Sequence, residues 1–518
     1  MTRSNATKDA GMRNRRKQLV VADSKFGPLF WEAFCLHGSR VQGLEFVILC
    51  LRPGQAKQYS GQNAFVGTVE ASLILDAYGK HDMSRQALAA FATDFERTAG
   101  TSIIDVLQTD RHLGRNYSYT GRRHPLSPLA ARANYWDSVA LIKQLYEFYL
   151  DQFDRHEIGT VLLGGVASLP LKLLCVAAKT AGLDVRVIAT ARVGNRLIWA
   201  RDEFLSIPQL AEAWQRHGST MAVRANSGNE AESRPDALYG YAATVRSQAR
   251  FSRRFTIAGL LTAVLGDLAL SSLQGARRML KATRKKAGRY YLGSRLRNHL
   301  NAYSDYRVLH RCCDPAWKRP QDTPYVFLPL HVEPEASLAV LSPEFNTQLG
   351  MIDLIAKALP AGVTLVVKEH RAAIGRRPEG FYDWLQNIPA VVLAPLEASG
   401  PTLARNSRVT VTITGTAGFE AAVAGVPVIT FGEHNFYNCL PHVHVLRDLR
   451  TLRTLLHAVT RSDQDRKQLC YDGKRFFDCL LAVSIDLGHE TLSPRLAPSQ
   501  QAIEKLFDGF WSTLDRRG

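Results

Sequence analysis

The side chains best suited to chemistry follow four short apolar runs in the C-terminal half of the chain. Each run has the length and composition of a buried strand, and each is followed by a polar loop. The four apolar runs are residues 325–328, 363–367, 408–413 and 427–431. In an open parallel sheet, ligands bind where such loops leave the carboxyl ends of the strands. We therefore expect these loops to form a ligand site.

The loop after residues 408–413 has the composition of a phosphate-binding turn. It begins with Thr414, Gly415 and Thr416, whose small size lets backbone amides approach an anion and whose two hydroxyls add donors. The helix expected at residues 417–424 points its positive end at the same place. Glu420, in the first turn of that helix, is a candidate for binding ribose hydroxyls. The alternative interpretation is a capped helix start, as in any α/β protein.

The loop after residues 363–367 carries charge and hydrogen-bond donors. It begins with Lys368, Glu369 and His370, which we place among the donor-binding residues. In a transferase, Lys368 and His370 would offset the negative charge that develops on a departing nucleotide phosphate. A lone histidine at a strand end is otherwise a polar residue satisfied by its neighbours. Its place beside Lys368, on a strand expected to neighbour the phosphate turn, favours the functional interpretation.

Strands and helices alternate through both halves of the chain, which predicts an α/β fold with parallel sheets wrapped by helices. Further strands are expected at residues 44–51, 102–107, 159–163, 184–190 and 390–393. Helices are expected at residues 84–98, 129–154, 168–181, 344–358, 379–386, 400–406 and 498–514. The β-α repeats of the C-terminal half predict a doubly wound nucleotide-binding sheet.

Residues 320–445 resemble the capsular-polysaccharide biosynthesis family in the order and spacing of their motifs. The stretches that carry the resemblance are PLHVEPEASLAV, LVVKEHRAAIGRRPEGFYDWL and VTVTITGTAGFEAAVAGVPVITFG. The family includes transferases that use CMP-activated Kdo, and it is distantly similar to other GT-B enzymes that use CMP-sugars. The resemblance implies an α/β fold of two Rossmann-like lobes facing across a cleft, with a helical connector. It also implies that the C-terminal lobe holds most of the donor nucleotide.

The resemblance also implies roles for individual residues. His370 matches the histidine of the family's His-Pro element, expected near the donor phosphate and a catalytic candidate here. Thr414 and Thr416 match the hydroxyl-bearing phosphate turn, and Glu420 matches the helix carboxylate that holds the ribose.

The element Glu333-Pro334-Glu335 matches the family's Gln-Pro-Glu element. This match places Glu333 with the donor and Glu335 among the catalytic candidates. Two residues depart from the family pattern, namely Glu333 in place of Gln and Arg371 in place of the Pro after His370. An extra carboxylate near an anionic donor is unfavourable unless a cation compensates it, so these departures leave the identity of the donor open.

The acceptor side is less well defined. GT-B enzymes often take a general base from the N-terminal lobe, and Asp110 is the candidate because it follows the strand expected at residues 102–107. His112 and Asp137 are alternatives, and ordinary surface polar residues are the competing interpretation of all three.

We expect no metal and no cofactor other than the nucleotide-sugar substrate. The close match to an Asp-x-Asp metal motif, Asp463-Gln464-Asp465, precedes a helix and is expected to cap it. His442 and His444 have strand spacing, but no third ligand accompanies them in the sequence, so we expect them to be structural.

The composition is that of a folded protein of a reducing compartment. The 518 residues contain 46% hydrophobic and 22% charged residues, and the eight cysteines have no CxxC spacing. The net charge of +18 fits an anionic substrate or membrane surface, and no nucleic-acid recognition motif accompanies it. Residues 255–273 are apolar but contain Asp267, which favours a buried or interfacial helix over a membrane span. The basic stretch within 277–297 suits an anionic membrane surface, or a solvated helix face.

These observations predict a cytoplasmic glycosyltransferase, peripheral to the inner face of the membrane, that moves a sugar from a nucleotide to a surface-polysaccharide or lipid-linked acceptor. Two alternatives stay open: a transferase of polyol phosphate from a CDP-alcohol, and an inactive binding module of a polysaccharide assembly complex. The expected parts are a basic flexible arm (1–25), an N-terminal lobe (26–255), a helical basic connector (256–320), a C-terminal lobe (321–490) and a C-terminal helix (491–518) that packs back on the first lobe.

Overall fold

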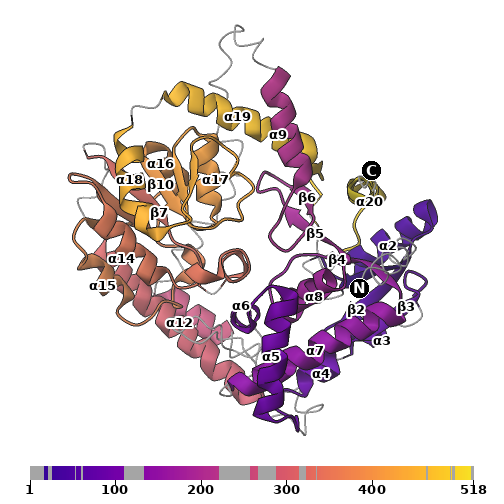
Figure 1. Ribbon diagram of the computed structural model, residues 1–518. Helices are drawn as coiled ribbons and strands as arrows, with labels where there is room; N and C mark the ends of the chain where they lie inside the picture. The colour runs from indigo at the N-terminus through magenta and orange to yellow at the C-terminus, as the bar shows by residue number, and fades with distance from the viewer. Residues whose placement is uncertain are drawn as a thin grey trace. The chain divides into compact units, whose positions relative to one another are not determined.

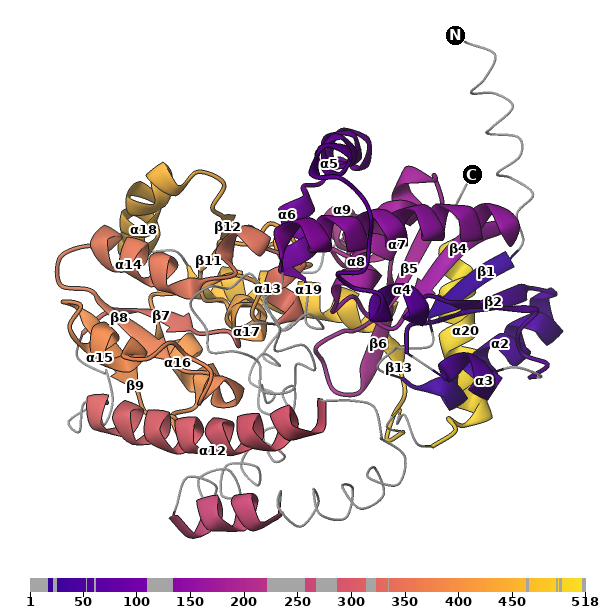
Figure 2. The ribbon, with the colours of Figure 1, turned by 90° about the horizontal axis from the view of Figure 1, so that it is seen from below.

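The chain folds into two α/β units, seen in the computed structural model of Figure 1 and Figure 2. Unit 1 contains Met1–Thr109, Ala133–Ala213 and Leu480–Gly518, and unit 2 contains Asp110–Arg132 and Trp214–Cys479. The structure describes residues 17–21, 26–52, 54–59, 62–109, 134–220, 257–266, 287–313, 323–333, 335–462, 465–490, 492 and 496–514. The expected linker at residues 224–238 lies outside the described residues.

Unit 1 is built on a seven-stranded sheet in the order β13-β6-β5-β4-β1-β2-β3. The strands β1 to β5 are parallel in the Rossmann order 3-2-1-4-5, and β6 and β13 add an antiparallel edge. The strands are β1 (Lys17–Val21), β2 (Glu45–Cys50), β3 (Gly67–Glu70), β4 (Ile158–Leu163), β5 (Asp184–Thr190), β6 (Arg196–Ala200) and β13 (Ile485–Asp486). The helices are α2 (Pro28–Gln42), α3 (Gln55–Tyr59), α4 (Ser72–Asp76), α5 (Arg85–Ala99), α6 (Ile103–Gln108), α7 (Tyr135–Arg155), α8 (Leu169–Thr180), α9 (Pro208–Thr220), which continues into unit 2, and α20 (Gln500–Leu514).

The core of unit 1 joins the two ends of the chain. Helix α20 packs against α2, as both ribbon views show, and Trp199 Nε1 donates to the carbonyl oxygen of Leu506 at 2.9 Å. Phe34 on α2 contacts the rings of Phe507 and Phe510 on α20. The last helix therefore packs on the N-terminal unit, to which the chain already returns at Leu480, before the expected boundary at 491.

Two expectations for unit 1 are wrong. Lys17–Val21 is an interior strand of the sheet and not part of a flexible arm, because its short apolar core pairs with β2 and β4 although basic residues precede it. Residues 102–107 are not a strand, since Ile103–Gln108 is helical. Ser102 and Asp105 form a capping box that starts this helix, with Ser102 Oγ accepting from the amide of Asp105 at 3.0 Å.

Unit 2 is built on a six-stranded sheet in the order β12-β11-β10-β7-β8-β9, and every adjacent pair is parallel. The strands are β7 (Tyr325–Pro329), β8 (Thr364–Lys368), β9 (Val391–Ala394), β10 (Val409–Thr412), β11 (Val428–Thr430) and β12 (Val443–Val445). The α-helices are α12 (Ala287–Cys312), α13 (Ala336–Ala339), α14 (Gln348–Ala358), α15 (Phe381–Gln386), α16 (Gly400–Asn406), α17 (Thr416–Val423), α18 (Leu452–Arg461) and α19 (Arg466–Val483). Short 3-10 turns are η2 (Pro343–Phe345), η3 (Arg371–Ala373) and η4 (Leu449–Thr451). Residues 257–266 are also helical.

Helix α12 belongs to unit 2 and is not a separate connector. Leu309 and Cys312 near its end are buried in the core of this unit, and Asp305 accepts a hydrogen bond from the amide of Gly375 at 3.1 Å. The apolar side chains of β7, β8 and β10 are buried in the core of this sheet. The predicted fold class, α/β with two Rossmann-like sheets, is confirmed.

Candidate functional site

The sheet of unit 2 reverses its strand order between β7 and β10. From this pair, β8 and β9 follow on one side and β11 and β12 on the other. In doubly wound sheets the loops at such a switch point diverge, and ligands bind outside the carboxyl ends of the strands there. Because all six strands are parallel, the four polar loops of the sequence lie at this same edge.

The turn after β10 is tightly built. Thr412 is buried, and its Oγ1 accepts from the amide of Gly415 at 3.1 Å. A Cβ on Gly415 would lie 2.7 Å from Thr412 Oγ1 and 3.3 Å from His331 Cε1, so only glycine fits without a shift. Helix α17 begins at Thr416, which is exposed, and no side chain caps it at Gly415. Its first amides are therefore suited to an anion.

Thr414, expected to offer its hydroxyl to a phosphate, is buried beneath the turn. A Cβ on Gly432, in the loop after β11, would lie 2.8 Å from its Cγ2. Its backbone amide donates to His331 Nε2 at 3.5 Å. Thr414 thus holds the loops after β7, β10 and β11 together, whereas Thr416 is the threonine exposed at the start of the helix.

His331 is the histidine that contacts the phosphate turn. Its Nε2 lies 3.4 Å from Thr412 Oγ1. Its backbone is fixed by Gln348, which accepts from the His331 amide at 2.7 Å and donates to the His331 carbonyl at 3.1 Å. The sequence motifs alone assign no role to His331. The available signal was its place directly after a strand that, in the folded sheet, pairs with β10.

A fully buried arginine, Arg377, holds the loop after β7 in place. Its Nε and Nη2 donate to the two carboxylate oxygens of Glu369, both at 2.8 Å, and Nη2 also donates to the carbonyl of His331 at 2.6 Å. Its Nη1 lies 3.3 Å from Glu333 Oε1. Burial alone would lower the pKa of the Arg377 guanidinium, but the attraction of Glu369 and Glu333 raises it above its ordinary value.

Glu333 and Glu369 are parts of this buried network. Glu333 Oε1 accepts from the amide and from Nε2 of Gln348, both at 2.7 Å, and Tyr382 donates to Glu369 at 3.0 Å. Both carboxylates are buried and bonded within this network, where they position the loop, and their direct contact with the donor stays a prediction. Arg377 is the cation that compensates the carboxylate of Glu333.

His370 lies farther from the phosphate turn than expected. Strand β7 lies between β8 and β10, so the expectation that His370 ends a neighbouring strand is wrong. Adjacent strands are about 4.8 Å apart, which puts the two strand ends roughly 10 Å apart. A ligand that contacts both strand ends must therefore extend well beyond a single phosphate group.

The ring of His370 is accessible and oriented. Its Nδ1 accepts from the amide of Ala372 at 3.1 Å, so the neutral ring carries its proton on Nε2. Burial lowers the pKa of His370, against the nearby carboxylates of Glu335 and Glu369. His370 is thus a neutral donor through Nε2, and Glu335 lies within its electrostatic range.

Lys368 is directed elsewhere. Its Nζ donates to the carbonyl of Leu396 at 3.1 Å, beyond the end of β9. Burial, together with the charge of Arg371, lowers its pKa to about 8. Its side chain alternates with that of Glu369 along the chain, so the two leave the strand end on opposite faces. No described contact brings Lys368 to the phosphate turn.

Glu420 is half-buried in α17. Burial raises its pKa to about 7, opposed by the charge of Arg405. A carboxylate that is partly protonated near neutral pH is sensitive to any ligand that donates hydrogen bonds to it. Its binding of ribose stays a prediction.

Among the remaining candidates, only Asp137 and Asp465 lie within the described residues. Asp110 and His112 lie outside the described residues. Asp137, in unit 1, is 3.2 Å from His81 Nε2. Asp465 accepts from the amide of Lys467 at 2.9 Å and caps α19, as predicted, whereas residues 463 and 464 are not described.

The other sequence expectations concern metals, thiols and the membrane. His442 Nε2 is 2.8 Å from the carbonyl of Ala422, a structural contact. Within the described ranges no group of three metal-ligating side chains occurs, and no helix is long and apolar enough to cross a membrane. All eight cysteines are free thiols.

Residues 280–440 match the family model described as capsule polysaccharide biosynthesis protein. This match confirms the resemblance that the sequence indicates, over the part of the chain that contains α12 and the strands β7 to β11. The match covers just under a third of the chain. No curated protein matches the chain significantly.

Solved structures resemble the chain at low scores. The β-Kdo 2,4 transferase of KpsC from Thermosulfurimonas dismutans is 12% identical, with 61% of this chain and 79% of that chain covered and a TM-score of 0.29. The β-Kdo 2,7 transferase of the same protein is 13% identical, with 66% and 87% covered and a TM-score of 0.28. The S. aureus MnaA–UDP co-structure is 10% identical, with 96% and 97% covered and a TM-score of 0.29.

Proposed function

We propose that the protein is a glycosyltransferase that binds a nucleotide-sugar donor at the switch point of unit 2. The observation that carries the proposal is the contact of His331 with the turn Thr412–Gly415 at the uncapped start of α17. This is the place where doubly wound sheets bind nucleotides, and a short helix start there favours a phosphate. The capsule polysaccharide family match over the same residues supports a glycosyltransferase role.

The donor's parts are assigned from this geometry. The first amides of α17 and the hydroxyl of Thr416 bind the phosphate, and Glu420 accepts from the ribose hydroxyls. Nε2 of His370, two strand spacings away, donates to an acidic group of the sugar. A CMP-activated sugar such as Kdo is the favoured donor, and no metal is required because helix amides and neutral donors stabilise the charge.

In the reaction, the bond between the anomeric carbon and the donor phosphate oxygen breaks, and the electron pair leaves with the nucleotide. An acceptor hydroxyl of a surface polysaccharide or lipid-linked glycan forms the new glycosidic bond and loses its proton to a base. Asp110 remains the predicted base.

Nucleotide binding tests the donor site. We expect one of CMP, CDP, UDP or GDP, with CMP favoured, to raise the free energy of unfolding by about 2.7 kcal/mol at a hundred times its dissociation constant. Thermal-shift measurement of the full chain gives this readout. Gly415→Ala should abolish the stabilisation, because the added methyl group collides with Thr412. Gly400→Ala is the matched control, since a Cβ there meets nothing within 4 Å. Equal stabilisation of Gly415→Ala and Gly400→Ala by the nucleotide would show that the turn after β10 does not bind it.

Turnover then separates the alternatives. Product from labelled nucleotide sugars supports the glycosyltransferase, and product only from labelled CDP-glycerol assigns a polyol-phosphate transferase. Nucleotide binding without turnover of either donor, when a glycolipid extract supplies acceptors, assigns a binding module. His370→Ala serves as the active-site control in each assay.

We further propose that the protein binds an anionic membrane surface peripherally. Helical residues 257–266 expose Ile257, Leu261 and Leu265, at 65%, 55% and 64%, and their spacing of four places them on one face. Basic residues follow in the sequence from Arg277 onward. An apolar helix face beside basic residues is typical of interfacial helices.

Vesicle binding tests this surface. We expect co-sedimentation with vesicles that contain phosphatidylglycerol and little with pure phosphatidylcholine. Leu261→Glu should lower binding by about tenfold, because it removes apolar area worth about 1.5 kcal/mol or more and adds a like charge to the lipid. Leu354→Glu, at another exposed leucine of unit 2, is the control. Undiminished binding of Leu261→Glu would contradict the proposal.

A further inference from the structure

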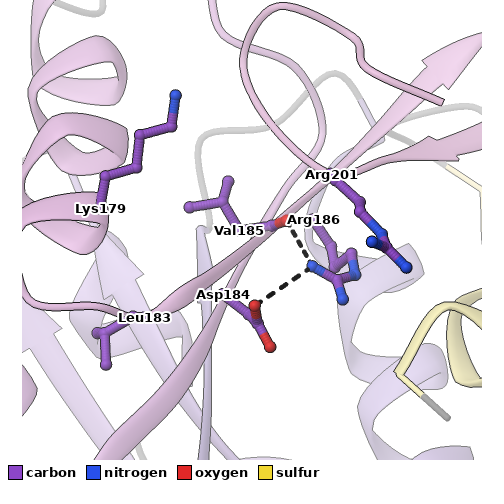
Figure 3. Close-up of a pocket in the computed structure, with 6 residues that line it drawn as sticks. All are labelled: Lys179, Leu183, Asp184, Val185, Arg186 and Arg201. Atoms are coloured by element: carbon purple, nitrogen blue, oxygen red, sulfur yellow. Dashed lines mark hydrogen bonds and ion pairs between the residues drawn. The ribbon is translucent and has the colours of Figure 1, made fainter. Parts of the chain in front are cut away.

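A cavity of about 160 Å³ lies in unit 1, beside the N-terminal end of β5 and the C-terminal end of β6 (Figure 3). Its lining residues are Lys179, Leu183, Asp184, Val185, Arg186 and Arg201. Because β5 is parallel to β4, its N-terminal end lies at the amino ends of the parallel strands. The cavity is therefore on the opposite side of the sheet from the loops that follow the carboxyl ends of those strands. Its lining residues all belong to unit 1, whereas the residues of the proposed donor site belong to unit 2.

The two arginines are brought together by strand pairing. Val187 pairs with Ala200 in the antiparallel β5–β6 ladder, so the next pair in this register is Arg186 opposite Arg201. Opposite residues of an antiparallel pair have Cβ atoms about 5 Å apart on the same face, and like charges there are destabilising. An anion bound between the two guanidinium groups would replace their mutual repulsion with attraction to a shared negative charge.

The two guanidinium groups have different surroundings. Arg186 is buried and donates to Thr513 Oγ1 at 2.9 Å and to the Thr513 carbonyl at 3.1 Å, which holds the end of α20. Nε of Arg201 is buried and has no hydrogen-bond partner in the part of the chain that the structure describes. A buried N–H without a partner costs free energy, so Arg201 is the residue whose chemistry calls for an acceptor.

Lys179 contributes less to the cavity. Its Nζ lies 2.8 Å from Glu203 Oε2 and over the ring of Phe204, and Figure 3 shows it directed away from the two arginines. Asp184 lies on the side of Arg186, 3.8 Å from its Nη1. Each nitrogen of Arg186 donates within the chain, with Nη1 bonded to the carbonyl of Val185 at 3.0 Å, so Arg201 is the less occupied of the two guanidinium groups.

We propose that this cavity is a binding site for a small oxyanion, held by Arg201 and Arg186. A guanidinium binds phosphate or carboxylate oxygens through two parallel hydrogen bonds, and two adjacent guanidinium groups favour a group with two or more such oxygens. The ligand is a phosphate group or the carboxylate of an acidic sugar. Through the contacts of Arg186 with Thr513, anion binding also strengthens the packing of α20 on the sheet of unit 1.

Anion titration of the full chain tests the site, at ionic strength kept constant with sodium chloride. The probes are inorganic phosphate, glucuronate and, as a neutral control, glucose, with thermal shift and calorimetry as readouts. We expect saturable stabilisation by phosphate, by glucuronate or by both. Arg201→Gln should weaken it at least about tenfold, because a charge-assisted pair of hydrogen bonds is lost. Arg97→Gln, an exposed arginine of unit 1, should leave it unchanged.

The comparison of variants isolates this cavity from the donor site, because the loops of unit 2 are the same in all three proteins. Stabilisation by phosphate alone assigns a phosphate ester, and stabilisation by glucuronate assigns an acidic sugar. Arg201→Lys, which keeps the charge but not the planar fork, should bind with intermediate affinity and provides a second variant if Arg201→Gln folds poorly. Anion binding that is unchanged in both variants, or absent from the unaltered protein, overturns the proposal.

Discussion

Replacing Arg377 by Met is expected to lower the free energy of unfolding by about 3–5 kcal/mol. The substitution keeps most of the side-chain volume but leaves Glu369 and Glu333 buried without their cation. It also removes the Nη2 donor from the carbonyl of His331. Chemical denaturation at neutral pH measures the change.

The matched control for this variant is Arg450→Met. Arg450 also forms a forked pair with a carboxylate, that of Asp448, but this pair is exposed, with Arg450 at 90%. Exposed ion pairs contribute about 0–1 kcal/mol, so the control should cost no more than that. Similar losses in the two variants would contradict the importance of burial.

A double-mutant cycle identifies the partner carboxylate. Glu333→Gln keeps an oxygen that can accept from Gln348 and restores the residue type of the resembled family. In the Arg377→Met background it removes one of the two uncompensated charges, so it should recover part of the lost stability. A coupling free energy of about 1 kcal/mol or more between the two positions is expected for groups in direct contact. Additive effects would show that Glu333 is compensated in another way.

The loops of the donor site could be predicted from the sequence, but their arrangement could not. Short apolar runs followed by Thr414–Gly418 or by Lys368–Arg371 predict strand ends because hydrophobic periodicity is a local signal. The strand order is set by long-range pairing, and β7 takes the place between β8 and β10. His331 consequently occupies the position beside the phosphate turn at which the sequence predicts His370.

Buried polar networks are the other part that local patterns do not reveal. Arg377 follows Arg376 and precedes a proline, in a stretch that has the composition of a surface loop. Only the folded chain places it among Glu369, Glu333 and the carbonyl of His331. The carboxylate at Glu333 predicted that a compensating cation was needed, but not which one. Lys17–Val21 was missed for a similar reason, since its strand is stabilised by both neighbours and not by its own composition.

Glu420→Gln is expected to stabilise the protein in mild alkali and to weaken nucleotide binding at the same time. Burial raises the pKa of Glu420 in the folded chain to about 7 from its ordinary value of 4.5. A raised carboxyl pKa contributes stability fully below the unfolded value, and this contribution is lost as the pH rises toward 7. Above pH 7 the buried charge is a constant cost of about 2 kcal/mol, discounted for its partial exposure. Glutamine avoids that cost, so the two proteins should differ at pH 8 and converge near pH 5.

The ionised carboxylate of Glu420, which destabilises the folded protein, would contribute to binding of the nucleotide donor. An ionised carboxylate accepts two hydroxyl hydrogen bonds more strongly than a neutral amide does, so Glu420→Gln should lower the affinity for the nucleotide by about tenfold to a hundredfold at pH 8. In the unaltered protein the proton competes with the ribose, and binding should weaken as the pH falls below 7. Because a nucleotide phosphate also titrates in this range, the measured quantity is the difference in nucleotide affinity between the two proteins, determined by calorimetry from pH 6 to pH 8.

Glu379→Gln, at an exposed carboxylate of the same unit, should change neither stability nor affinity. A variant that gains stability but keeps its nucleotide affinity would place the ribose away from α17, while the raised pKa would still be explained by burial alone.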